Sequence, residues 1–190
     1  MTPEDEDAEG LARLSEILVF EQPLGGTAQD VVDLARDALG QCDGVGIQVL
    51  DDGGDGGIGA RRTTDARSFD LDALQDELDD GPCVECLRDG EHHDLEPVTS
   101  DERWPRFGPS ARRVGLIACA ALPLIAHGEH IGVLNLYAWP EIGFAGWDRR
   151  QCGSFANRAS NLLSSARAYD RRQALIGRLE ARLAAIPGTQ

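Results

Sequence analysis

Residues 116–138 read LIACAALPLIAHGEHIGVLNLYA, and they carry the strongest signal for the fold of this chain. It holds two nearly continuous apolar segments, Leu116–Ile125 and His130–Ala138, which are joined by Ala126-His-Gly-Glu129. Segments of this length and composition are typical of β-strands that are covered on both faces. We therefore expect two paired strands at the centre of a sheet.

The flanking segments predict a second strand pair and several helices. Val45–Leu50 alternates and is rich in β-branched residues, and Ile58–Thr64 follows it after a turn rich in glycine and aspartate. Thr27 with Asp30 resembles a capping box that would begin a helix. Apolar spacing and end signals predict helices at residues 8–20, 27–39, 71–78, 82–90 and 147–185, a helical stretch through Trp104 and Phe107, and a short strand at 91–95.

This order of elements predicts an α+β domain with a central antiparallel sheet, because strand pairs alternate with inserted helices rather than single strands with single helices. A change in charge near residue 147 suggests where the last helix leaves the domain. We divide the chain into an N-terminal helix over residues 1–21, a domain over 22–146 and a long C-terminal helix over 147–186.

The charge of the chain argues against binding to nucleic acid or to an anionic membrane. The 190 residues carry a formal net charge of −15, and both partners reward positive charge. Residues 148–185 are the exception, with a net charge of +5 against −20 for the remainder. Attraction of this basic helix to its own acidic domain explains the asymmetry as well as RNA binding does.

The sequence predicts a cytoplasmic location. Its longest apolar run, Val114–Ala126, is too short for the roughly 20 residues of a spanning helix. The first residues are acidic and lack the basic start and apolar run of a signal peptide. Five cysteines, an odd number, fit no simple disulfide framework and are expected to be reduced thiols.

Three motifs together resemble the GAF domains of actinobacterial regulators of the GAF/ANTAR type. They are Gly81-Pro-Cys-Val-Glu-Cys-Leu-Arg-Asp-Gly90, Asp101-Glu-Arg-Trp-Pro-Arg-Phe107 and the paired strands within Ala121–Tyr137, and the similarity covers about residues 24–170. The resemblance implies a sheet of about six antiparallel strands, with helices on one face and a ligand pocket on the other.

The resemblance also implies a sensory module, since GAF domains bind small molecules, haem, bilins or cyclic nucleotides, or act as dimerisation units. The Asn-Lys-Phe-Asp-Glu pattern of cyclic-nucleotide GAF domains is absent from this lysine-free chain, and no Cys-His pair suits covalent bilin attachment. The residues after Arg171 are too few for an ANTAR module. The cofactor is therefore unknown.

Cys83 and Cys86 are the most distinctive candidate site residues. Two thiols three residues apart on one helix suit disulfide exchange or metal binding, and a helix N-terminus lowers a thiol pKa. Nearby carboxylates act in the opposite direction, and a C-x2-C-x5-H-H spacing through His92 and His93 is not a standard zinc spacing. Buried structural cysteines, redox sensing and metal binding all stay open, and no metal site is assigned.

Four further residues complete the candidate pocket. Trp104 and Phe107 share one helical face and are interpreted as core or pocket wall, and Cys119 and Asn135 lie on the two central strands.

The last helix repeats an apolar residue every seven positions, at Phe155, Leu162, Tyr169, Ile176 and Leu183. That row is half of a coiled-coil seam, and its companion row is weak. About 38 residues at about 1.5 Å each give a helix of roughly 57 Å, longer than the domain that it covers. The excess length predicts a partner, of which a second copy of the chain is the simplest.

These observations predict a non-enzymatic, cytoplasmic sensory domain that binds a small ligand or senses redox state. It would transmit that state through a helical homodimer, in signalling or transcription control. Two alternatives come from other classes. One is a cysteine enzyme of the same fold, such as a free methionine-(R)-sulfoxide reductase, and the other is RNA binding through the arginine-rich last helix.

Overall fold

The structure is a computed structural model that describes residues 22–40, 42–51, 57–95, 98, 102–140 and 147–185. The helix expected over residues 8–20, and with it the proposed N-terminal unit, lies outside the described residues. The remaining division of the chain at residue 147 stays a prediction.

The described residues form one antiparallel sheet of five strands, close to the six that were expected. The strands are β1 Gly44–Leu50, β2 Ile58–Thr63, β3 His93–Leu95, β4 Ala118–Ala126 and β5 Glu129–Ala138, in the spatial order β2-β1-β5-β4-β3. β5 is central, with Asn135 opposite Gly46 of β1 and Ala121 of β4. The apolar stretch that opens the sequence analysis therefore forms the middle of the sheet, and the α+β prediction is confirmed.

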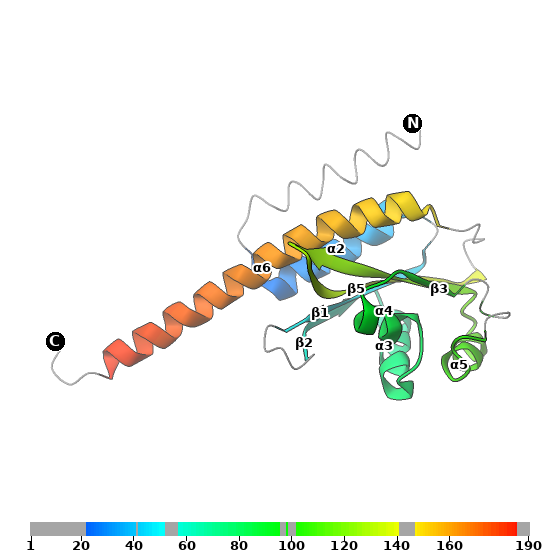
Figure 1. Cartoon of the computed structure of the whole chain (residues 1–190), viewed down its shortest axis with the longest axis horizontal. Helices are drawn as coiled ribbons and strands as arrows, with labels where there is room; N and C mark the ends of the chain where they lie inside the picture. Colours follow the sequence, from blue (N-terminus) through cyan, green and yellow to red (C-terminus); the bar gives the residue numbers. More distant parts are fainter. Residues whose placement is uncertain are drawn as a thin grey trace.

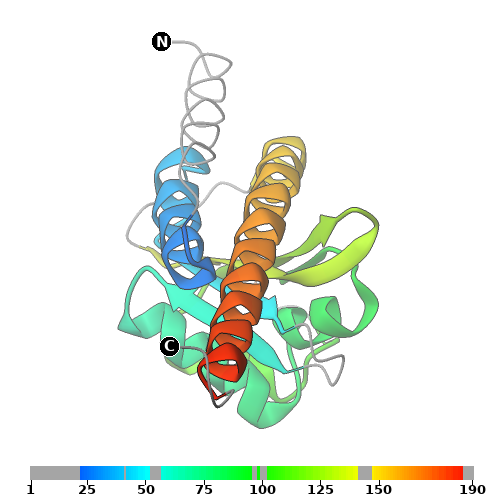
Figure 2. The same cartoon turned by 90° about the vertical axis from the view of Figure 1, so that its left-hand side faces the viewer.

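Helices cover both faces of this sheet, whereas the resemblance implies helices on one face only. Helices α2 (Leu24–Ala38) and α6 (Arg149–Ala184) lie side by side on one face, as the blue and orange helices of Figure 2 show. Helices α3 (Ala66–Leu78), α4 (Pro82–Asp89) and α5 (Phe107–Arg113) lie on the opposite face, where the resemblance implies a ligand pocket (Figure 1).

The alternation of strand residues creates two separate interiors. Val45, Ile47 and Val49 of β1 join the apolar core under α2 and α6, whereas Gly46 and Gln48 face α3 and α4. β4 and β5 divide their side chains in the same way. Each central strand therefore contacts both helical layers, as expected for a period of two residues.

Helix α2 begins three residues earlier than predicted. Its N-cap is Pro23, and Thr27 lies in the helix, where its buried hydroxyl donates to the Pro23 carbonyl at 3.3 Å. The capping box predicted at Thr27 is therefore wrong. Asp170 of α6 replaces it, since its carboxylate accepts a hydrogen bond from the Leu24 N–H at 3.1 Å. A partner across the tertiary structure thus satisfies a free N–H of the first turn.

Helix α6 has a buried half and an exposed half. Its buried side chains fall between Cys152 and Ala166, whereas residues 171–185 are all exposed. In Figure 1 the second half projects beyond the sheet toward the C-terminus. Among the described helices, none combines the length and apolar character that crossing a membrane requires.

A glycine at the centre of the sheet gives a direct test of this packing. Gly132 has φ 155°, and a Cβ there would lie 2.2 Å from the Gln48 carbonyl oxygen. We expect Gly132→Ala to lower the free energy of unfolding by at least about 2 kcal/mol, because the β1–β5 pair must separate. Chemical denaturation measures the change.

The matched control is Gly153→Ala on α6, where nothing lies within 4 Å of an added Cβ. This substitution is expected to stabilise the chain by roughly 0.5–1 kcal/mol, because alanine favours a helix more than glycine does. Equal effects of the two substitutions would contradict the close contact between β1 and β5.

Candidate functional site

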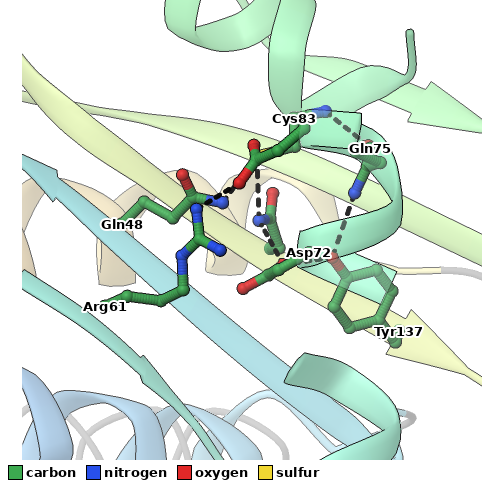
Figure 3. A network of polar contacts seen from close by, with 8 residues as sticks. Gln48, Arg61, Asp72, Gln75, Cys83 and Tyr137 are labelled. Carbon is green, nitrogen blue, oxygen red and sulfur yellow. Dashed lines mark hydrogen bonds and ion pairs between the residues drawn. The ribbon is translucent and has the colours of Figure 1, made fainter. Parts of the chain in front are cut away.

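A layer of buried polar side chains lies between the sheet and helices α3 and α4. Each of its six residues is no more than 1% exposed: Gln48 on β1, Asp72 and Gln75 on α3, Cys83 on α4, and Asn135 and Tyr137 on β5. We call these six residues the Asp72 network. Figure 3 shows its labelled side chains gathered between the strands and the helices.

The Asp72 carboxylate joins α3 to the central strand. Its Oδ1 accepts hydrogen bonds from Asn135 Nδ2, at 2.9 Å, and from the Tyr137 hydroxyl. Gly46 on β1 makes this approach possible, because a Cβ there would lie 2.5 Å from Asp72 Oδ2. Asp72 therefore packs against bare backbone as well as against its two donors.

Gln75 and Cys83 extend the network to α4. Gln75 Nε2 donates to the Tyr137 hydroxyl at 3.1 Å, and Gln75 Oε1 accepts from the Cys83 N–H at 2.9 Å (Figure 3). The Cys83 sulfur lies 3.1 Å from Asn135 Nδ2 and 3.5 Å from Gln48 Nε2. One turn of α3 thus positions the first turn of α4, whose N-cap Gly81 has φ 133°.

Three acceptor oxygens of this network have no hydrogen-bond partner among the described residues: Gln48 Oε1, Asp72 Oδ2 and Asn135 Oδ1. A buried polar atom without a partner costs free energy, and native structures leave few of them. A network that served only to hold the fold together would be expected to satisfy these three oxygens.

Burial raises the pKa of Asp72 from 3.8 to about 6, and the hydrogen bonds from Tyr137 and Asn135 and the charge of Arg61 oppose that rise. Arg61 on β2 points toward the network in Figure 3, but its ion pair is with Asp76. Asp72 thus carries a buried negative charge near neutral pH with no cationic side chain hydrogen-bonded to it among the described residues.

Cys83 and Cys86 are both fully buried, and they pack with Ala121 and Val133. Burial raises the pKa of the Cys83 thiol well above its usual value and that of the Cys86 thiol to about 12. A reactive cysteine needs access and a lowered pKa. This geometry favours the structural interpretation over redox sensing, and the described residues contain no cluster of three or more His, Cys, Asp or Glu side chains suited to a metal.

Trp104, Phe107 and Cys119 form an apolar cluster beside the network. They pack with Tyr137 and Trp139, and the Tyr137 and Trp139 rings lie 6.1 Å apart. Of the predicted site residues, the structure therefore brings Cys83 and Asn135 into direct contact and places the other four around them. His92 and His93 make no hydrogen bond to the Asp72 network in the described part of the chain. They pair with Asp94 and Asp89 at 2.5 and 2.9 Å, and the edge of one ring of the His93–Trp104 pair faces the other, with centroids 6.2 Å apart.

Sequence reasoning missed four members of the network: Gln48, Asp72, Gln75 and Tyr137. A signal for two of them exists in α3, where Asp72 and Gln75 follow Leu71 at positions that share its buried face. On β5, Tyr137 lies two residues after Asn135 and so shares its face. Polar residues on an otherwise apolar face indicate either a buried network or a site.

Comparison with known proteins identifies the fold. A family model described as GAF domain matches residues 21–164. The GAF domain of an Acinetobacter phosphoenolpyruvate-protein phosphotransferase is similar, with a TM-score of 0.60 at 15% identity over 87% of this chain and 97% of that one.

Two other solved structures are similar in the same way. A domain of a two-component sensor histidine kinase protein from Sinorhizobium meliloti 1021 gives a TM-score of 0.53 at 22% identity, over 80% of this chain and 99% of that one. Free methionine-R-sulfoxide reductase from Neisseria meningitidis, in complex with its substrate, gives a TM-score of 0.55 at 15% identity, over 82% of this chain and 86% of that one. Such identities show the fold alone, and the chain has no significant match among curated proteins.

The charge of Asp72 predicts a pH-dependent difference between the parent and Asp72→Asn. Because the folded pKa is raised, Asp72 favours the folded state below pH 3.8, and this contribution is lost as the pH rises toward the folded value of about 6. The asparagine side chain does not titrate, so the variant should gain roughly 1.4 kcal/mol relative to the parent between about pH 5 and about pH 8. Urea denaturation at both pH values measures this.

Asp70→Asn on the exposed side of α3 is the matched control, and its difference from the parent should change little over the same range. A pH-independent difference for Asp72→Asn would show that Asp72 keeps an ordinary pKa in the folded protein.

The burial of the two thiols predicts that they resist alkylation. Native protein treated with iodoacetamide should keep Cys83 and Cys86 unmodified until a denaturant unfolds the chain, with or without prior peroxide, as read by mass spectrometry. Ser154→Cys, at an exposed position of α6, provides a thiol that should react at once. A Cys83–Cys86 disulfide formed by mild peroxide would instead support redox sensing.

Proposed function

The chain belongs to the GAF domain family, and we propose that it is a non-enzymatic sensory domain whose ligand state is transmitted by α6 within a homodimer. The chain is related to signalling domains because it belongs to the same family as they do. The ligand, the dimer and the output are our proposal.

The division of α6 is the observation that carries this proposal. Its first half packs on the sheet, with Phe155 and Leu162 only 2% and 4% exposed. Its second half presents an apolar stripe, which we define as Leu175, Ile176, Leu179 and Leu183, each between 42% and 64% exposed. A stripe of four large apolar side chains is unfavourable in water, so this segment needs a covering surface.

A second copy of the same segment is the covering that the stripe fits best. Its residues recur at the spacing of one helical face, and two such faces exclude water from each other in a coiled coil. Phe155 and Leu162 already belong to the core of their own domain. The interface therefore uses Tyr169, Ile176 and Leu183 of the predicted seam, together with Leu175 and Leu179.

The sheet supplies a route from the Asp72 network to α6. In β4, Ala121 packs with Cys83 and Cys86, whereas its neighbours Ala120 and Leu122 belong to the core that α6 covers. A ligand that moves α3 or α4 therefore acts on a strand that α6 contacts directly. Differential binding to two arrangements of the sheet then shifts the population of two dimer arrangements.

The finer parts of the proposal draw on the sequence. The motifs at Gly81-Pro-Cys83 and Trp104-Pro-Arg-Phe107 favour kinship with actinobacterial regulators, and hence a role in transcription control. All five cysteines are free, which fits a reducing cytoplasm.

The two alternatives receive less support. A cysteine enzyme requires an accessible thiolate, whereas all five cysteines are buried. RNA binding by α6 competes with burial of its apolar stripe, and the chain as a whole carries a charge of −15.

Substitution of the stripe tests the proposal. Ile176→Asp with Leu183→Asp places charge in the seam and should raise the dissociation constant of the dimer at least about a hundredfold, because buried charge without a partner is strongly unfavourable. Sedimentation velocity at micromolar concentration measures the change, and the parent chain should be a dimer.

Ala174→Asp with Ala181→Asp is the matched control. These two residues have the same spacing of seven and are exposed on the opposite side of α6, so the same added charge should leave the dimer intact. A monomeric parent, or equal dissociation of both double variants, would exclude the proposed interface.

A further inference from the structure

Two groups fix the direction of most hydrogen bonds in the Asp72 network, because one of them can only donate and the other can only accept. The Cys83 backbone N–H can only donate, so it orients the Gln75 amide and turns Gln75 Nε2 toward Tyr137. Tyr137 thus accepts from Gln75 and donates its own proton to Asp72. An ionised carboxylate can only accept, so Asn135 must present Nδ2 to Asp72 Oδ1.

This chain of donors and acceptors leaves an excess of acceptors. Asn135 Oδ1, Asp72 Oδ2 and Gln48 Oε1 have no hydrogen-bond partner among the described residues. The neutral Cys83 thiol has a single S–H, which can donate to at most one of them, so at least two acceptors remain without a donor. All three side chains are at least 99% buried. Rotation of the Asn135 amide cannot remove the excess, because it would place its oxygen against the carboxylate.

The excess of acceptors coincides with an excess of negative charge. Asp72 is ionised near neutral pH, and Arg61 is engaged by Asp76 rather than by Asp72. The nearby Cys83 thiol is neutral, because burial holds its pKa well above the usual value. A buried charge is normally balanced by an opposite charge or a bound ion.

We propose that the Asp72 network recognises a small organic cation that carries two or more N–H donors, of the amidinium, guanidinium or primary ammonium class. Its N–H groups would bind Asp72 Oδ2 and the free oxygens of Asn135 and Gln48, and its charge would neutralise the carboxylate. This inference rests on the proposed function and specifies the class of its ligand.

The complete burial of the network determines how such a cation enters. It reaches Asp72 only when α3 and α4 separate from β1 and β5, and this opening makes association slower than association with a site that is already open. The same movement changes the packing of α4 on β4, and β4 also packs against α6. Recognition and transmission are therefore one structural event.

Acetamidinium, acetamide and acetate form a matched set of probes with nearly equal shape and with charges of plus one, zero and minus one. Each is titrated into the full chain at constant ionic strength, with potassium chloride as the salt control. NMR of the side-chain amides of Asn135 and Gln48 reports binding. We expect saturable shifts with acetamidinium and at least tenfold weaker binding of acetamide and acetate.

Three variants make the result specific. Asp72→Asn should weaken acetamidinium binding at least tenfold. Gln48→Met keeps the shape of the side chain but removes an acceptor, and it should weaken binding several-fold. Asp70→Asn, exposed on the same helix, should bind as the parent does. Circular dichroism and thermal unfolding establish that each variant is folded.

The remaining outcomes overturn the inference in different ways. If acetamide or acetate binds as well as acetamidinium, or if Asp72→Asn binds equally well, the ligand class is wrong while ligand binding at this face stands. If potassium alone produces the same shifts, the network is a metal-cation site. If no probe moves these resonances, the network does not bind a small organic cation and the inference fails, whereas the homodimer of the proposed function is tested separately by sedimentation.

Discussion

The arrangement of one face of the domain depends on a single buried carboxylate. Asp72 holds α3 against the central strand through Asn135 and Tyr137, and it needs the bare backbone of Gly46 to do so. Gln75, one turn further along α3, then orients Tyr137 and binds the first N–H inside α4. Two helices and two strands are therefore positioned by one set of bonds, whose directions are set by the Cys83 N–H and the Asp72 carboxylate.

The second face of the sheet is organised differently, mainly by apolar packing. Helices α2 and α6 share a core with the alternate residues of β1, β4 and β5, and Asp170 joins the start of α2 to the point where α6 leaves the domain. Beyond Asp170 the helix is not packed on its own sheet, since residues 171–185 are all exposed. The strands contact both helical layers, so they join the polar face to α6. Only the first half of α6 is packed on the sheet.

Local patterns account for what was predicted well and for what was predicted wrongly. The strands and α6 follow from periodicity within a few residues, and Pro82 and Gly90 correctly mark the ends of α4. The capping box at Thr27 failed because Asp170, 143 positions away in the sequence, supplies the missing acceptor. Phe155 and Leu162 continue the seven-residue row, but the sheet buries them, and periodicity does not distinguish a partner helix from a sheet beneath.

The fold class, the central strand pair, the long terminal helix and the region of the site can be inferred from the sequence, because each of these rests on residues that are neighbours in the chain. It named Cys83 and Asn135 but left open whether the thiols are structural or reactive, because their reactivity depends on burial that no spacing reveals. Only the tertiary structure decided that Asp72 is the charge at the centre of the site. Gly46, Asp72, Cys83 and Asn135 are far apart in sequence. The folded sheet places the Asn135 amide within hydrogen-bonding distance of Asp72 and Cys83, and it places the Asp72 carboxylate beside the Gly46 backbone. Burial away from water then raises the pKa of Asp72 and makes unpaired oxygens costly.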